Sequence, residues 1–547
     1  MLTRLRIQNY RCVEEMEIPF SGLTALVGPN GSGKTSILRA LSSLFGEAWP
    51  SLRSFRIPQD FAEFDTRRPI EITGWLKPAF VHEDALNKKH EIVAVRLSCR
   101  PYKSSGRWGE AGDLHTDLEP LNAKGEVPVV ATTPPKKGTP PTFRPLSVTG
   151  DLREYTKLLF VDHRRSLAQH VPTIRGSILG RLLEPARRSF SRQDDFKSAY
   201  ESALDILRTD NVREIEEKIR ETTKRMLGFL GRDASKALDV GLGFADPANP
   251  FNSLRLEYRE SGRAYPGDEL GLGIQSAVVV GIFEAFRQIG GGFQSVVIEE
   301  PEMYLHPQAQ RYFYRLLCEM AETNSSQVVY TTHSPIFADV NKFEALRLIR
   351  REPSKSSTMS YVRPEEFKTL SDERERQKLA GRFDPTRNEV LFASRALIVE
   401  GHADRVGALL VAEKLDVDVD AESIAIVDCG GKNSIPLVAR VCRSLRIPFT
   451  VFHDEDIWPV EKAADKSSQE EENRLAESEN RRIAEAVGKE GSLFVAKPTL
   501  EAMLGIGRSA KDKPLKVVDK LRDMKLSDVP QALIDAVKAV LPPEKQS

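Results

Sequence analysis

The stretch Gly28-Pro-Asn-Gly-Ser-Gly-Lys-Thr35 decides the fold of the first half of the chain. It fits the pattern G-x-x-x-x-G-K-[ST], follows the apolar run Leu23–Val27 and opens a segment with helical spacing. In this context, backbone N–H groups of the glycine turn and of the helix N-terminus bind phosphate oxygens. We expect Lys34 to reach the β- and γ-phosphates and Thr35 to bind Mg²⁺. The other candidate nucleotide-binding residues are Gly28, Asn30, Gly31, Ser32, Gly33 and Ser36. A glycine turn that merely precedes a helix is the alternative.

The composition is typical of a folded chain with several domains. The 547 residues are 40% hydrophobic and 29% charged, which excludes a disordered chain. At about 100–200 residues per domain, this length predicts about three or four domains. Lys plus Arg and Asp plus Glu each number 79. This balance excludes a uniformly basic protein that coats nucleic acid, although it is compatible with local basic grooves.

Cysteine usage and hydropathy indicate the setting of the protein. The five cysteines form no C-x-x-C pair, which argues against a disulfide framework or a zinc ribbon. No apolar run is long enough to span a membrane, and the N-terminus is not that of a signal peptide. We therefore expect a cytoplasmic protein that does not engage a membrane.

Two further segments fit a nucleotide site. Ser295–Glu300 is an apolar strand that ends in two carboxylates. We expect Glu299 to lie on the metal side and Glu300 to act as general base toward the attacking water. His333 follows another apolar strand, Gln327–Thr331, and is a candidate contact to the γ-phosphate. A solvent-exposed carboxylate pair and a structural histidine are the alternatives.

These segments resemble the ABC-type ATPase heads of structural-maintenance and RecF-like proteins. Gly28–Thr35 matches Walker A and Val296–Glu300 resembles Walker B, although Glu299 stands where most ABC proteins have Asp. His333 is similar to the switch histidine. The resemblance implies that ATP is the cofactor.

A second glycine-rich turn, Gly271-Leu-Gly-Ile-Gln275, resembles the signature motif of the same family. Gly271, Gly273 and Gln275 are the candidate phosphate-facing residues, although the usual Leu-Ser-Gly-Gly-Gln spelling is missing and an ordinary helix N-terminus is the alternative. Gln59 is the candidate glutamine of the Q-loop. In this family the signature of one head completes the nucleotide site of another, so the resemblance implies a homodimer.

Four acidic residues follow strands in the last third of the chain. Glu400 ends the apolar run that starts at Leu397, Asp404 lies on the first turn of the next helix, and Asp454 and Asp456 end a third apolar run. Open α/β sheets bind ligands at the carboxyl ends of their strands. Four such carboxylates repel each other unless a cation neutralises them, and oxygen ligands select Mg²⁺ or Mn²⁺. Two ions about 3.5–4 Å apart can clamp the attacking and leaving oxygens of a phosphodiester. Turn and cap residues are the alternative.

This acidic set resembles that of a Toprim domain. An ABC-type head followed by Toprim in one chain resembles the OLD (overcoming lysogenization defect) family of nucleases, and the four carboxylates fall on the family's motif positions. The resemblance implies that Glu501 helps to bind a second metal ion and that Lys513 lies near the scissile phosphate. A surface lysine is the alternative for Lys513. The turn Gly430-Gly-Lys432 is a candidate phosphate contact, and a plain turn explains it equally well.

We therefore expect an α/β protein in which an ABC-type ATPase head with a helical insertion precedes a C-terminal Toprim α/β domain. The expected bounds are 1–165 for the N-terminal part of the head, 166–245 for the helical insertion and dimerisation element, 246–370 for the C-terminal part of the head, 371–391 for a linker and 392–547 for Toprim.

The leading hypothesis is an ATP-dependent or ATP-regulated DNA endonuclease that uses two-metal catalysis, and the resemblance implies defence against phage. The alternative is an ATP-driven DNA-binding clamp or repair module of RecF-like type with a non-catalytic Toprim domain. A topoisomerase needs an active-site tyrosine, and none follows Tyr361. The sequence leaves open whether an additional protein partner takes part. The candidate basic contacts to DNA are Arg164, Arg165, Arg187 and Arg188.

Overall fold

The computed structural model describes most of the chain, and its contacts divide the chain into two compact units. The described residues are 1–46, 55–101, 114–134, 140–162, 179, 210–229, 239–244, 254–260, 263–265, 270–289, 295–322, 326–352, 355–363, 385–462, 465–508 and 512–542. Unit 1 comprises Met1–Leu26, Asn30–Thr332 and Ile349–Thr358, and unit 2 comprises Val27–Pro29, His333–Leu348 and Met359–Ser547. No helix in these ranges is long and apolar enough to cross a membrane.

Two sheets and the helix between them form the frame of the chain before residue 362, most of which belongs to unit 1. The antiparallel sheet has the order β2 (Val13–Pro19), β1 (Leu2–Tyr10), β4 (Ile70–Glu83), β5 (Lys89–Pro101) and β6 (Leu114–Leu121). A second sheet has the order β16 (Thr358–Tyr361), β15 (Leu346–Arg350), β3 (Leu23–Val27), β14 (Gln327–Thr332), β13 (Ser295–Glu299) and β9 (Leu158–Val161). Helix α1 (Lys34–Phe45) contacts strands of both sheets. A two-stranded sheet, β7 (Val129–Ala131) with β8 (Phe143–Pro145), and helices η2 (Ala62–Phe64) and α2 (Gly150–Thr156) complete this part.

The strands that carry the predicted nucleotide residues lie at the centre of the second sheet. Strand β13 pairs in parallel with β14 on one side and with β9 on the other. Every residue of β13 and β14 is buried, as expected of a parallel sheet covered on both faces. Glu299 lies opposite Thr331 in the register. Residues that follow these two strands therefore emerge at the same edge of the sheet.

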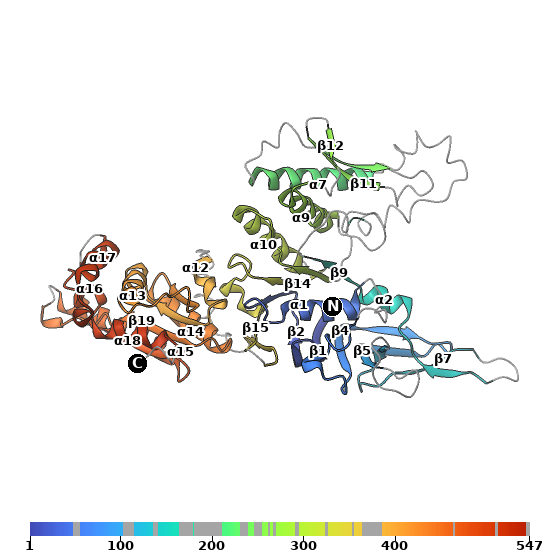
Figure 1. The fold of residues 1–547 in the computed structure, drawn as a ribbon, viewed down its shortest axis with the longest axis horizontal. Coiled ribbons are helices and arrows are strands. Elements are labelled where there is room, and N and C mark those ends of the chain that lie inside the picture. Colours follow the sequence, from blue (N-terminus) through green and yellow to red (C-terminus); the bar gives the residue numbers. More distant parts are fainter. Residues whose placement is uncertain are drawn as a thin grey trace. The chain divides into compact units, whose positions relative to one another are not determined.

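Helix α10 (Pro307–Glu322) contacts β14 of this sheet, and helices α7 (Asp210–Phe229) and α9 (Leu272–Ile289) pack against each other and against α10 (Figure 1). Helix α7 lies within the expected helical insertion, residues 166–245, most of which lies outside the described residues. The sequence reading did not predict the antiparallel sheet β10 (Asp239–Phe244), β11 (Leu254–Glu260) and β12 (Arg263–Tyr265) beside α7. The short helix η3 (Val340–Ala345) follows β14.

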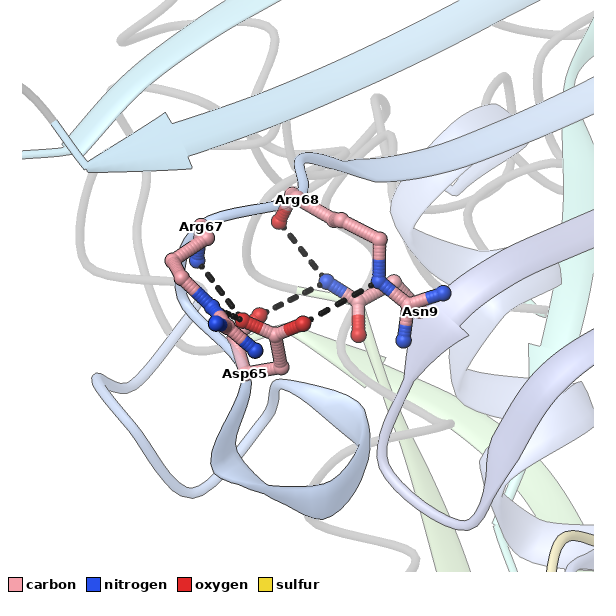
Figure 2. A network of polar contacts seen from close by, with 4 residues as sticks. All are labelled: Asn9, Asp65, Arg67 and Arg68. Carbon is pink, nitrogen blue, oxygen red and sulfur yellow. Dashed lines mark hydrogen bonds and ion pairs between the residues drawn. The ribbon is translucent and has the colours of Figure 1, made fainter.

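A polar network fastens the loop before β4 to the first strand (Figure 2). Asn9 is buried, and its side-chain Nδ2 donates to the carbonyl oxygens of Asp65 at 3.0 Å and Arg68 at 2.7 Å. The Asp65 carboxylate accepts from Arg67 Nε at 2.8 Å and Arg68 Nε at 3.2 Å. The hydrogen bond from Arg67 lowers the pKa of Asp65 to about 2. The hydrogen bonds from Asn9 thus hold this loop against β1.

The C-terminal α/β fold is built on a parallel four-stranded sheet. Its order is β18 (Ile424–Asp428), β17 (Arg395–Val399), β19 (Phe449–Asp454) and β20 (Ser492–Ala496), with every pair parallel. The helices are α12 (Pro385–Asn388), η5 (Glu389–Leu391), α13 (His402–Lys414), η6 (Lys432–Ser434), α14 (Ile435–Ser444), η7 (Val460–Lys462), α15 (Lys466–Val487), α16 (Leu500–Met503), α17 (Lys513–Asp523), η8 (Leu526–Asp528) and α18 (Gln531–Val540).

Helices cover both faces of this sheet (Figure 1). Helices α13, α17 and α18 close one core, to which the sheet contributes Leu397, Val399 and Phe452. Helix α14 packs on β17 and β19 and is itself covered by α15. The last residues of the predicted linker, Val390 and Leu391, are fully buried. The folded domain therefore begins before β17. Because its four strands are parallel, their carboxyl ends lie at one edge of the sheet.

Candidate functional site

The glycine-rich loop adopts the backbone that phosphate binding requires. Gly28, Gly31 and Gly33 have φ values of 146°, 74° and 109°, a region that residues with a Cβ rarely occupy. Helix α1 begins directly after the loop, and the N–H of Ile37 donates to the Gly33 carbonyl at 3.1 Å. Asn30 is exposed at the tip of the loop. The loop thus presents backbone donors at a helix N-terminus, as the motif predicts.

The structure places the predicted Walker A and Walker B residues together. Thr35 Oγ1 donates to Glu299 Oε1 at 2.8 Å, across 264 positions of sequence. Lys34 is buried, which lowers the pKa of its ammonium to about 8, while the carboxylates of Glu300 and Glu302 oppose that shift. A buried cation beside acidic residues at a helix N-terminus is suited to bind a polyphosphate with its metal ion. Glu300 itself follows β13 with a φ of 49°.

The five other predicted nucleotide residues come from three further segments of the chain. Gly271 and Gly273 lie at the start of α9, and Gln275 Nε2 donates to the Leu270 carbonyl at 2.8 Å, so this side chain turns back on its own helix start. His333 is the residue directly after β14 and is half-buried. Gln59 is exposed in the turn next to Asp60, a buried carboxylate.

The acidic residues of the second site come from neighbouring strand ends. Glu400 follows β17, and Asp454 is the last residue of β19, the strand beside it. Asp404 lies in the first turn of α13, where its Oδ2 accepts from the Gly401 N–H at 3.0 Å. Glu501 lies in α16 next to Leu500, whose N–H donates to Asp454 Oδ1 at 2.8 Å. The sheet edge and these two helix starts thus bring the predicted carboxylates to one side of the domain.

Mutual repulsion and burial raise the proton affinity of this group. Burial, with the neighbouring charge of Asp456, raises the pKa of Glu400 to about 7. Burial also raises the pKa of Asp404 and of Asp454; Glu400 is the largest charge acting on Asp404, and Asp404 is the largest acting on Asp454. Such shifts arise where several carboxylates share a desolvated place without a cation. They are typical of functional sites.

The donor set fits a divalent cation. Glu400 Oε2 is buried without a hydrogen-bond partner, and an unpaired buried carboxylate oxygen is costly. All five candidate ligands supply oxygen, which Mg²⁺ and Mn²⁺ prefer. In the described parts of the chain, no three acidic, histidine or cysteine side chains are arranged to hold an ion as they stand. Hydrogen-bond donors occupy one oxygen each of Asp404, Asp454, Asp456 and Glu501.

Two lysines lie within this acidic group. Lys513 Nζ is 3.3 Å from Glu501 Oε1, where α17 begins. Lys432, in the glycine turn after β18, donates to Asp456 Oδ2 at 2.8 Å. Sequence reasoning treated this turn as a phosphate contact or a plain turn and did not foresee the contact with Asp456. It also missed Asp428, which ends β18 and whose charge helps to raise the pKa of Asp404.

The signal for Asp428 was present in the sequence. It is an acidic residue at the end of an apolar strand, the same pattern that singled out Glu400 and Asp454. The predicted basic contacts at Arg164, Arg165, Arg187 and Arg188 lie outside the described residues.

Comparisons with known proteins match both halves of this chain. A family model described as an AAA ATPase domain matches residues 1–99 and 154–338. One described as an overcoming lysogenization defect protein-like TOPRIM domain matches residues 391–456. These matches confirm the predicted order of an ATPase head and a Toprim domain in a mixed α/β chain.

Two relatives and one solved structure illustrate the range of similarity. The OLD nuclease of Thermus scotoductus is 56% identical over 543 residues, which cover 99% of this chain and 98% of the relative. The DNA replication and repair protein RecF of Yersinia enterocolitica is 48% identical over 66 residues, or 12% of this chain and 18% of RecF. A crystal structure of an Smc head bound to the C-winged helix domain of ScpA has a TM-score of 0.41 and 15% identity, and covers 67% of this chain and 99% of that one. By its identity to the first of these over nearly the whole length, the chain belongs to the OLD nuclease family, with an AAA-type ATPase domain followed by an OLD-like Toprim domain.

Proposed function

We propose that this ATPase-linked, metal-dependent nuclease is an endonuclease that nicks or cleaves DNA in its Toprim domain, with Mg²⁺ or Mn²⁺ as the cofactor. The observation that carries the proposal is the group of buried carboxylates around Glu400, whose pKa values rise through desolvation and mutual repulsion. A divalent cation relieves both effects at once. A purely structural acidic patch would instead stay in water, whereas Asp404, Asp454 and Glu501 are buried.

In this proposal the carboxylates hold the metal ions and a lysine contacts the DNA. Glu400, Asp404, Asp454, Asp456 and Glu501 would hold the metal ions, which supply polarisation of the phosphodiester and an activated water when bound. Asp404 and Asp454 are oriented by backbone N–H groups, so their positions do not depend on flexible side chains. The ammonium of Lys513, set against Glu501, is placed to meet a phosphate oxygen near the bond that is cut.

The ATPase domain regulates this cleavage in the proposed scheme. Lys34 would bind the β- and γ-phosphates of ATP, and Thr35 and Glu299, which contact each other, would hold its Mg²⁺. Glu300 orients the attacking water as general base, and His333 contacts the γ-phosphate.

The scheme requires two copies of the chain. Leu272 is 44% exposed at the start of α9, beside Gly271, Gly273 and Gln275, although it is a large apolar residue. We propose that this signature segment completes the nucleotide site of a second copy, so that ATP controls the geometry of a homodimer.

A plasmid-nicking assay tests the proposal. Wild-type protein with Mg²⁺ or Mn²⁺, with and without ATP, is expected to convert supercoiled DNA to nicked or linear forms. Asp454→Asn should lose this activity by at least about 100-fold, because it removes a charged ligand. The matched control is Asp519→Asn on the exposed side of α17, which should cut like wild type.

Cleavage by Asp454→Asn at the wild-type rate would refute the nuclease site. If neither protein cut DNA while ATP was still hydrolysed, an ATP-driven DNA clamp of RecF-like type would be the better description of the chain.

A further inference from the structure

Lys432 is a buried lysine whose ammonium contacts a carboxylate of the proposed metal site. Its side chain is only 5% exposed, whereas that of its partner Asp456 is 38% exposed. Lys432 Nζ donates to Asp456 Oδ2 at 2.8 Å and to the Glu455 carbonyl at 3.2 Å. A lysine stays in water unless a partner repays its desolvation. The pair with Asp456, and not solvent, therefore determines where this ammonium lies.

The backbone on both sides fixes this pair. Gly431 has a φ of 136°, and its N–H donates to the Glu400 carbonyl at 2.8 Å. The turn that carries Lys432 is thus tied to the turn that carries Glu400. On the other side, the N–H of Asp456 donates to the Pro498 carbonyl at 2.8 Å. Neither partner depends on a freely moving loop to meet the other.

The burial of Lys432 also excludes a direct contact with DNA in this arrangement. Two other lysines, which contact Glu501 and Glu455 respectively, are open to solvent: Lys513 is 40% exposed and Lys497 is 71% exposed. Those two are available to a phosphate backbone. Lys432 faces inward, where the charges it meets belong to the proposed metal ligands.

We propose that Lys432 is the internal counter-ion of the carboxylate site, which holds Asp456 while no divalent cation is bound and competes with that cation for the carboxylate. This inference rests on the proposed function, because it requires a metal ion at the site. Lys432 is a positioning residue in this scheme. Its compact ammonium on a flexible stem can leave the carboxylate without disturbing the strand ends. Metal binding is then a cation exchange, which raises the concentration of divalent cation needed to occupy the site.

Metal titration of the full-length protein tests the exchange without any measurement of cleavage. Metal-free protein is titrated with Mn²⁺ by calorimetry, and unbound Mn²⁺ is counted by electron paramagnetic resonance. Lys432→Met keeps the length of the side chain but removes its charge, and it should lower the Kd for Mn²⁺ by about fivefold or more, because the competing cation is gone. Lys432→Arg keeps the charge and should return the Kd toward the wild-type value.

The matched control is Lys497→Met. Lys497 Nζ is 3.6 Å from Glu455 Oε1, so this variant removes the same charge beside the same loop without touching a proposed ligand. Its Kd should change by less than about twofold, as expected for an exposed ion pair. The circular dichroism of each variant reports whether it is folded, and Lys432→Gln carries the same expectation if Lys432→Met does not fold.

A double-mutant cycle separates competition at Asp456 from a general charge effect. In an Asp456→Asn background, the effect of Lys432→Met on Mn²⁺ affinity should vanish, because the contested carboxylate is absent. The inference is overturned if Lys432→Met weakens or does not change Mn²⁺ binding, or if its full effect persists in that background. Failure of the wild-type protein to bind Mn²⁺ would instead overturn the proposed function itself.

Discussion

Replacing Glu400 by Gln should stabilise the metal-free Toprim domain, although the residue is proposed to be essential for cleavage. Burial and the charge of Asp456 raise the pKa of Glu400 from 4.5 to about 7. Its folded-state pKa therefore lies above the unfolded value, so the folded protein binds the extra proton and loses stability as pH rises through that interval. Above pH 7 the carboxylate is charged in both states, and the full cost is present.

The magnitude follows from the size of the shift. At about 1.4 kcal/mol per pKa unit, the charged Glu400 costs about 3 kcal/mol at pH 8 and about 1 kcal/mol at pH 5. In a domain of this size, about 3 kcal/mol corresponds to a rise in Tm of about 6–12 °C. Glu400→Gln avoids that cost, since an amide does not ionise.

Thermal unfolding in EDTA at pH 5 and pH 8 measures the effect, with the Toprim transition followed separately from that of the ATPase domain. The control is Glu413→Gln. Glu413 is an exposed residue of α13, so this variant should shift neither transition. Mn²⁺ should stabilise wild type more than Glu400→Gln at pH 8. A Tm gain that is equal at both pH values, or a loss of stability at pH 8, would refute the electrostatic reasoning.

Three further outcomes follow from the two sites. Lys34→Ala should abolish ATP turnover while metal-dependent nicking stays at least partly intact, as measured by phosphate release and plasmid nicking; equal loss of both would show tight coupling. Gly33→Ala should lower ATP affinity by at least about tenfold. The φ of Gly33 is +109°, and an added Cβ would lie 2.7 Å from Ser357 Oγ and 2.8 Å from Cys12 Sγ. A nucleotide-binding titration measures this loss, and unchanged affinity would contradict it. Nicking rates measured across a salt series should fall as salt rises, because phosphate contacts dominate DNA binding; salt-insensitive cutting would exclude that mode.

The strands and the order of the two sites were predictable because each rests on a local pattern. Apolar runs buried on both faces gave β3 and β13 to within a residue, and the glycine loop between β3 and α1 is read from a contiguous motif. Strand ends predicted the carboxylates at Glu400 and Asp454 for the same reason. A parallel sheet places the carboxyl ends of all its strands at one edge. The position of each carboxylate along the sequence was therefore sufficient to predict that they lie on the same side of the domain.

The contacts that sequence reasoning missed depend on residues distant along the chain. The partner of Lys432 lies 24 positions away, on the far side of α14 and β19, and only the parallel register brings the two turns together. The antiparallel sheet beside α7 was missed although β10 and β11 alternate apolar residues with polar residues or glycine, because β10 falls within the segment that was assigned to the helical insertion.

Each of the two proposed sites contains a buried lysine. Among the residues that the structure describes, only Lys34 and Lys432 are buried lysines, and each lies at one of the two proposed sites. Their environments differ in a way that matches their proposed tasks. Burial lowers the pKa of Lys34 even though the carboxylates of Glu300 and Glu302 oppose that shift, so a further anion such as a polyphosphate would stabilise its ammonium. Lys432 is already paired with Asp456, so its compensation is present before any ligand binds. The first site is therefore built to gain an anion, and the second to exchange one cation for another.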